Sequence, residues 1–103
     1  MSPTFPPEQI QLVAHLTAKP GREQALVDAI TAIVPAVRRE PGCIAYLAHS
    51  SREDPGTVVM YEVWADQTAL DAHVKGANLA SLAARFDDLL SVPLRVEPLR
   101  RIA

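Results

Sequence analysis

The hydrophobic residues of this chain change their spacing from one segment to the next. Between Ile10 and Thr17 apolar and polar residues alternate with a period of two, which predicts a β-strand with one apolar face. From Arg22 onward the apolar residues fall at helical spacing instead, and Pro41-Gly42 ends the predicted helix. The apolar stripe of this helix consists of Leu26, Ile30, Ile33 and Val37.

Two more strands, two helices and a final strand follow from the same kind of pattern. Segments 43–50 and 57–64 are strand-like, and the turn sequence of residues 51–56 predicts that they pair as an antiparallel hairpin. Asp66 is a suitable N-cap for a helix over residues 67–75, and Asn78 for the helix after it. Residues 92–102 alternate again, and their two prolines predict an edge or irregular position for this last strand.

The predicted order is β-α-β-β-α-α-β, which is typical of an α+β, ferredoxin-like layer in which helices cover one face of an antiparallel sheet. Residues 57–64 are apolar on both faces, with Tyr61 on one side and Met60 and Trp64 on the other. One helical layer covers only one of these faces, so we expect a second copy of the chain to cover the other, in a homodimer. Residues 1–9 are expected to form a flexible lead to a single domain over residues 10–103.

Composition narrows the classes of function. The chain has 103 residues and a net charge of −2, and its 10 basic and 12 acidic residues are spread along its length, so we expect no binding to nucleic acid. Its one cysteine excludes an internal disulfide and suits a reducing cytoplasm. The N-terminus lacks the basic and long apolar segments of a signal peptide or membrane anchor. These features predict a cytoplasmic protein with no membrane partner.

The segment 58–73 concentrates the candidate chemistry. Its strand ends with Glu62 and Trp64, the only tryptophan, and the following helix carries His73 beside Leu70. An aromatic ring, a carboxylate and an imidazole within twelve residues indicate either an apolar pocket with a few polar groups or a hydrophobic corner that contains a histidine. The other residues expected in such a pocket are apolar: Met60, Leu70 and Phe86.

The register of the hairpin places two more residues relative to this site. If residues 51–56 form a six-residue loop, His49 shares the strand face that carries Glu62 and Trp64. The same register places Tyr46 on the opposite face beside Tyr61, as a core or interface aromatic. We therefore include His49 among the predicted substrate-binding residues.

Three groups of residues together resemble the antibiotic biosynthesis monooxygenase family, whose small members include quinol-monooxygenase-like proteins. They are Glu40-Pro41-Gly42-Cys43 with Tyr46, Glu62 with Trp64, and Ala69-Leu70-Asp71-Ala72-His73. The resemblance implies a dimeric α+β barrel with one pocket per subunit. It also implies that dioxygen oxidises a quinol-like or polyphenolic substrate without metal, flavin or other cofactor, because an electron-rich aromatic anion can itself reduce dioxygen.

The resemblance also implies roles for the candidate residues. His73 becomes the acid–base group that accepts a phenolic proton, and Trp64 is either a pocket wall that stacks on the substrate ring or plain core. Glu62 either orients a histidine or binds a substrate hydroxyl, with a structural hydrogen bond as the alternative. Ala14 stands where haem-degrading relatives carry an asparagine, and no histidine follows His73, so we expect pocket lining at Ala14 and no haem degradation.

Two other functions stay open from the sequence. One is an isomerase or processing enzyme for a small oxo or phosphorylated metabolite, which a pocket lined by arginine or lysine would favour. The other is a non-catalytic dimeric ligand-binding barrel, which a pocket filled by its own side chains would favour. The sequence offers no dinucleotide fingerprint and no compact metal motif, so we expect neither a cofactor nor a metal site.

Overall fold

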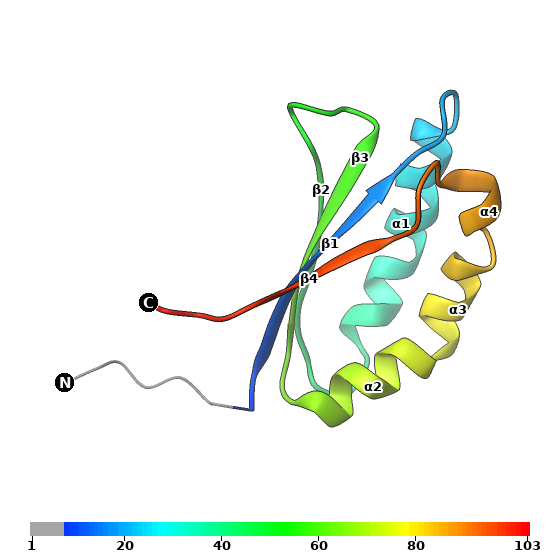
Figure 1. Cartoon of the computed structure of the whole chain (residues 1–103). Helices are drawn as coiled ribbons and strands as arrows, with labels where there is room; N and C mark the ends of the chain where they lie inside the picture. The colour runs from blue at the N-terminus through cyan, green and yellow to red at the C-terminus, as the bar shows by residue number, and fades with distance from the viewer. Residues whose placement is uncertain (1–7) are drawn as a thin grey trace.

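The computed structural model describes residues 8–103, so most of the predicted lead at residues 1–9 lies outside the described residues. The chain forms one sheet with helices α1 to α4 on one of its faces (Figure 1). The elements in chain order are β1 (Ile10–Thr17), α1 (Glu23–Arg38), β2 (Cys43–Ser50), β3 (Thr57–Trp64), α2 (Gln67–Lys75), α3 (Ala77–Ala83), α4 (Phe86–Leu89) and β4 (Arg95–Leu99).

The sheet has four strands in the order β2-β3-β1-β4, and each neighbouring pair is antiparallel. β1 pairs with β3 along its whole length, from Ile10 opposite Trp64 to Thr17 opposite Thr57. β4 lies at an edge, beside β1, as the prolines of this segment predict. These findings confirm the α+β, ferredoxin-like layer. Within residues 8–103 no helix has the length and apolar character needed to cross a membrane.

The core lies between the sheet and the helices. On β3 the inward side chains of Met60 and Trp64 are 2% and 0% exposed, whereas Tyr61 on the outer face is 37% exposed. The predicted apolar stripe of α1 packs on the sheet, with Ile33 partly buried at its side. The buried residues of α1 are Leu26, Ile30, Val34 and Val37.

Two predicted segments near the C-terminus had wrong boundaries. The predicted last helix is divided into α3 and the short α4, and β4 spans only Arg95–Leu99, not residues 92–102. Before that point Leu90 bridges Ala18, the Ser91 N–H donates to the Thr17 carbonyl, and Pro93 has no N–H to offer to the sheet. Residues 90 and 91 are therefore bound to the end of β1 and the residue after it, and regular pairing between β1 and β4 starts only further along the chain.

The predicted N-cap of the helix after α2 was also wrong. The N-cap of α3 is Gly76, and no side chain caps it. Asn78 lies inside α3, and its side-chain amide donates a hydrogen bond to Glu40 at 2.8 Å instead. This residue thus joins two distant segments and has no part in starting its own helix.

The predicted hairpin register was wrong beyond the first residue of β2. A β-bulge inserts one extra residue, Ile44, between Cys43 and the rest of the strand. Because side chains alternate along a strand, a shift of one residue turns every later side chain to the opposite face of the sheet. Tyr46 therefore lies opposite Glu62 on the face that the helices cover, and His49 lies opposite Val59 on the other face.

Candidate active site

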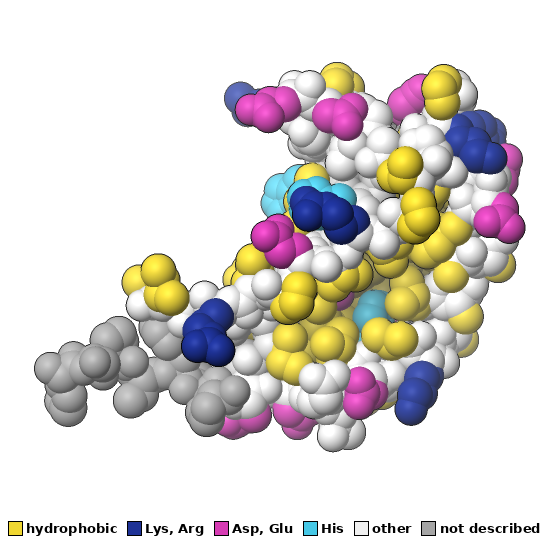
Figure 2. All heavy atoms as spheres, in the orientation of Figure 1, with side chains coloured by type: hydrophobic (Ala, Val, Ile, Leu, Met, Phe, Trp, Pro, Cys, Tyr) yellow, Lys and Arg dark blue, Asp and Glu magenta, His cyan; other side chains and the backbone are white. Residues whose placement is uncertain are grey.

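A cavity of about 150 Å³ lies between the inner face of the sheet and the helices. It opens on the side of the molecule seen in Figure 2, where hydrophobic side chains surround a hollow. An apolar cavity of this volume is large enough to hold one benzene-sized ring. Its lining consists of Leu12, Ala14, Leu16, Ile30, Tyr46, Met60, Glu62, Leu70, His73, Val74, Leu79, Leu82, Phe86, Leu94 and Val96.

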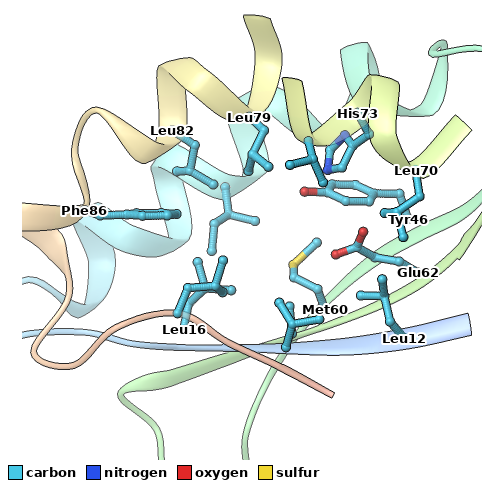
Figure 3. A pocket seen from close by; sticks show the side chains of 15 residues that line it. Leu12, Leu16, Tyr46, Met60, Glu62, Leu70, His73, Leu79, Leu82 and Phe86 are labelled. Carbon is cyan, nitrogen blue, oxygen red and sulfur yellow. The ribbon is translucent and has the colours of Figure 1, made fainter. Parts of the chain in front are cut away.

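Three of the lining side chains carry nitrogen or oxygen atoms, and they lie together. Tyr46, Glu62 and His73 are 3%, 6% and 3% exposed. Tyr46 is the direct cross-strand neighbour of Glu62, and its ring packs edge-on against the His73 ring with a centroid distance of 5.6 Å. The close-up shows all three at one end of the cavity, with Phe86 and Leu16 toward the other end (Figure 3).

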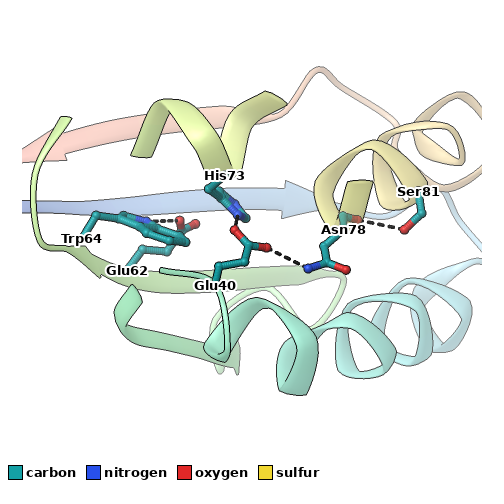
Figure 4. Close-up of polar contacts among 6 residues, drawn as sticks. All are labelled: Glu40, Glu62, Trp64, His73, Asn78 and Ser81. Carbon is teal, nitrogen blue, oxygen red and sulfur yellow. Dashed lines mark hydrogen bonds and ion pairs between the residues drawn. The ribbon is translucent and has the colours of Figure 1, made fainter. Parts of the chain in front are cut away.

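His73 is held by a carboxylate from the loop after α1. Its Nδ1 atom lies 2.9 Å from Oε1 of Glu40, and the second oxygen of Glu40 accepts from Nδ2 of Asn78 at 2.8 Å (Figure 4). An ionised carboxylate can only accept, so we assign the imidazole proton to Nδ1. In the neutral ring Nε2 is then the basic nitrogen, and it has no hydrogen-bond partner within residues 8–103.

The helix that carries His73 is positioned by its cap and by one glycine. Asp66 caps α2 by accepting from the Ala69 N–H at 2.8 Å. Gly42 has a φ of +79°, and a Cβ added to it would lie 2.4 Å from the Cβ of Ala69. The first turn of α2 therefore rests directly on the backbone at Gly42. This close approach brings His73 next to Glu40, which lies two residues before the glycine.

Trp64 lies behind His73 and does not line the cavity. Its ring is completely buried and stacks on the imidazole with a centroid distance of 4.5 Å and an interplanar angle of 28°. Its Nε1–H donates to Oε1 of Glu62 at 3.0 Å. The expectation that Trp64 forms a wall in contact with a substrate ring is therefore wrong for this structure. Its side chain supports the two polar residues that do face the cavity.

The other predicted site residues divide into two groups. The structure places Ala14, Met60, Leu70 and Phe86 on the cavity wall, together with Glu62 and His73. It places His49 outside, on an exposed strand end where Nδ1 lies 3.2 Å from the Val59 carbonyl. The bulge at Ile44 is the reason, because it turns His49 away from the cavity face.

Three residues of the site were not predicted from the sequence. Tyr46 was assigned to the wrong face, and Glu40 and Asn78 were not assigned to the site at all. Glu40 is 33 residues from His73 and 38 from Asn78, so no local spacing could connect them. A cue for Glu40 was its place in the Glu40-Pro41-Gly42-Cys43 motif.

Burial alters the acid–base chemistry of the two polar groups on the sheet. Loss of hydration raises the pKa of Glu62 above its ordinary value, and the hydrogen bond from Trp64 only partly opposes this. Burial, and then the neighbouring carboxylates of Glu62 and Glu40, raises the pKa of Tyr46 far above neutral pH. The Tyr46 hydroxyl is therefore a neutral hydrogen-bonding group. No group of three or more potential metal-binding side chains occurs in the described part of the chain.

The fold and site together define a small α+β domain with an apolar pocket between sheet and helices, and one end of this pocket carries a histidine that a half-buried carboxylate holds. Residues 10–85 match the model of one family, described as antibiotic biosynthesis monooxygenase. The chain belongs to this family. The match includes every helix and strand except α4 and β4.

Known proteins agree with this assignment. The chain is 29% identical over 98 residues to the protein of Escherichia coli strain K12 named "Probable quinol monooxygenase YgiN", covering 84% of this chain and 94% of that protein. It is 23% identical over 90 residues to the uncharacterized protein sll1783 of Synechocystis, and spans 61% of that protein's length. The crystal structure of protein SO0527 from Shewanella oneidensis superposes with a TM-score of 0.86 at 32% identity, covering 93% of this chain and 94% of that one.

Proposed function

We propose that this protein is a cofactor-independent monooxygenase that oxidises a quinol-like or polyphenolic ring with dioxygen. The single observation that carries the proposal is His73, whose Nδ1 is bound to Glu40 while its ring lines an apolar cavity. This arrangement leaves one basic nitrogen for a substrate proton. The family membership and the name of the Escherichia coli relative support the same reaction class.

The reaction begins with proton transfer from a phenolic hydroxyl to Nε2 of His73. The resulting phenolate passes one electron to dioxygen, and the phenoxyl radical and superoxide then join at a ring carbon that carries hydrogen, which forms a C–O bond. The proton on that carbon passes to the outer peroxide oxygen while the O–O bond breaks, so that hydroxide departs. The proton held by His73 goes to the departing hydroxide. One oxygen atom leaves as water and the other stays on the ring as a carbonyl, so a phenol and dioxygen yield a quinone and water.

The remaining lining residues support binding and protection of the ring. Glu62 and Tyr46 offer hydrogen bonds to ring oxygens, and the apolar wall excludes water from the anion and from the peroxide. None of the lining residues is arginine or lysine. The cavity therefore does not favour the alternative of a phosphorylated metabolite, which needs a cationic partner.

Oxygen uptake with a panel of reduced naphthoquinols and anthrones tests the reaction. We expect His73→Ala to lower turnover by about 10²-fold or more, the lower range for a lost general base. The matched control is His49→Ala, which removes an exposed histidine outside the cavity and should leave uptake unchanged. Undiminished uptake in folded His73→Ala contradicts the role of His73, and no uptake by the wild type with any panel member contradicts the function.

The cofactor-independent part of the proposal has its own measurement. Active protein should show no flavin or Soret absorbance band, and elemental analysis should find less than stoichiometric transition metal. One metal per chain, or a flavin spectrum that follows the activity through purification, contradicts it. We also propose a cytoplasmic location, which the single cysteine supports.

We propose that the protein acts as a homodimer in which the outer faces of two sheets pack together. The outer face carries Leu47, Tyr61 and Leu99, which are 41%, 37% and 40% exposed. Large apolar side chains gathered on one sheet face favour a covering partner. Light scattering should therefore return twice the chain mass of 11.2 kDa at micromolar concentration. A mass equal to one chain is the contrary result.

A further inference from the structure

The polar groups of the cavity are confined to one end. Tyr46, Glu62 and His73 meet there, and the rest of the wall offers only hydrocarbon and one thioether. Along β1 the cavity runs from Leu12, which lies opposite Glu62, to Leu16, which lies opposite Val58. Four strand residues span about 13 Å. An oxygen directed toward the Leu16 end of the cavity would therefore meet only apolar side chains.

Each polar group at this end has hydrogen-bonding capacity left over. Glu62 uses one oxygen for Trp64, and its second oxygen has no partner among the described residues. The Tyr46 hydroxyl has no hydrogen bond in residues 8–103, and His73 keeps Nε2 available. Buried polar groups without partners are costly, so a ligand that pairs with several of them at once gains affinity.

We propose that the ring bound in this cavity carries two oxygens on adjacent carbons, along the edge that faces Tyr46, Glu62 and His73. The first hydroxyl donates to Nε2 of His73. The second accepts from the Tyr46 hydroxyl and donates to the open oxygen of Glu62. A para-diol can place only one of its oxygens at this end. The other oxygen loses its hydration and faces an apolar wall. The inference rests on the proposed function for the aromatic nature of the substrate, and it narrows that class to ortho-dioxygenated rings.

A matched pair of isomers tests the inference without turnover. Benzene-1,2-diol and benzene-1,4-diol have the same atoms and differ only in where the second hydroxyl lies. Calorimetric titration under nitrogen should give a dissociation constant at least about tenfold lower for the 1,2-isomer, which corresponds to one satisfied buried hydrogen bond. Equal affinity, tighter binding of the 1,4-isomer, or no binding of either isomer at millimolar concentration overturns the inference.

One substitution identifies the residue that recognises the second oxygen. Tyr46→Phe removes a hydroxyl that has no protein partner, so the fold is retained, and the ratio of the two affinities should fall to below about threefold. Tyr61→Phe is the matched control, because Tyr61 lies on the outer face of the sheet, and its ratio should equal that of the wild type. An unchanged ratio in Tyr46→Phe also overturns the inference.

The outcome is separable from that of the proposed function. Preference for the 1,2-isomer with no oxygen uptake supports the binding inference and contradicts the monooxygenase. Oxygen uptake from both isomers at equal efficiency, with equal affinities, supports the monooxygenase and contradicts the inference.

Discussion

Replacing Glu40 with alanine removes the carboxylate that accepts hydrogen bonds from the side chains of His73 and Asn78. The Glu40 carboxylate, 17% exposed, accepts from His73 Nδ1 at 2.9 Å and from Asn78 Nδ2 at 2.8 Å. His73 is 3% exposed, so its Nδ1–H cannot exchange Glu40 for bulk water. Asn78 is half-buried and can be partly rehydrated. The loss of stability caused by the substitution is therefore larger at the His73 donor than at the Asn78 donor.

The magnitude follows from these two environments. An unsatisfied buried donor at His73 costs about 1–3 kcal/mol, and a lost hydrogen bond at Asn78, where water can enter, costs about 0.5–1.5 kcal/mol. Together Glu40→Ala should lower the free energy of unfolding by about 1.5–4.5 kcal/mol. For a domain of this size the melting temperature falls by roughly 7–21 °C. Glu40→Gln keeps an amide that can pair with both residues, so its stability loss should stay below about 1 kcal/mol.

Urea unfolding followed by Trp64 fluorescence measures both variants. Glu53→Ala is the matched control, because Glu53 is exposed in the turn between β2 and β3 and should change stability by less than about 0.5 kcal/mol. Glu40→Gln should nevertheless lower oxygen uptake by about 10²-fold or more, because the charge that keeps the proton on Nδ1 is lost. A loss of stability in Glu40→Ala no larger than in Glu53→Ala would refute the reasoning from buried hydrogen bonds.

Three further predictions concern the elements around the site. Gly42→Ala and Gly21→Ala both place a side chain at positive φ, but only at Gly42 does the new Cβ meet another atom, 2.4 Å from Cβ of Ala69. Urea unfolding should therefore show Gly42→Ala to be less stable than Gly21→Ala by about 1–3 kcal/mol, and equal losses would contradict the tight packing of α2. Because burial raises the pKa of Glu62 above 4.5, the folded state binds this proton more tightly than the unfolded state, and stability falls as pH rises from 4.5 through the folded pKa. Glu62→Gln should remove this part of the dependence of unfolding free energy on pH, measured by urea unfolding. If the wild type and Glu62→Gln show the same dependence on pH, the carboxyl is hydrated in the folded state. Trp64→Ala empties a completely buried site and should cost about 3–5 kcal/mol in thermal unfolding followed by circular dichroism, whereas a loss below about 1 kcal/mol would place the ring outside the core.

Local patterns determined the elements and most of the cavity wall. The alternation in β1 and β3 and the helical spacing in α1 depend on neighbouring residues only, and burial on one side follows from them. The same logic placed His73 beside Leu70 on the inward side of α2, where both line the cavity. The Asp66 cap was equally readable, because a capping hydrogen bond forms within one turn of the helix.

Tertiary structure alone decided how the polar groups of the site are used. The bulge at Ile44 exchanged Tyr46 for His49 on the cavity face, and the pattern of β2 gives no sign of where an extra residue is inserted. The partner of His73 is Glu40, 33 residues away, and the two meet only because α2 packs closely on Gly42. Sequence periodicity reports which side of an element is buried. It does not report which distant donor and acceptor meet there, because that depends on the register between strands and on the packing of helices across them.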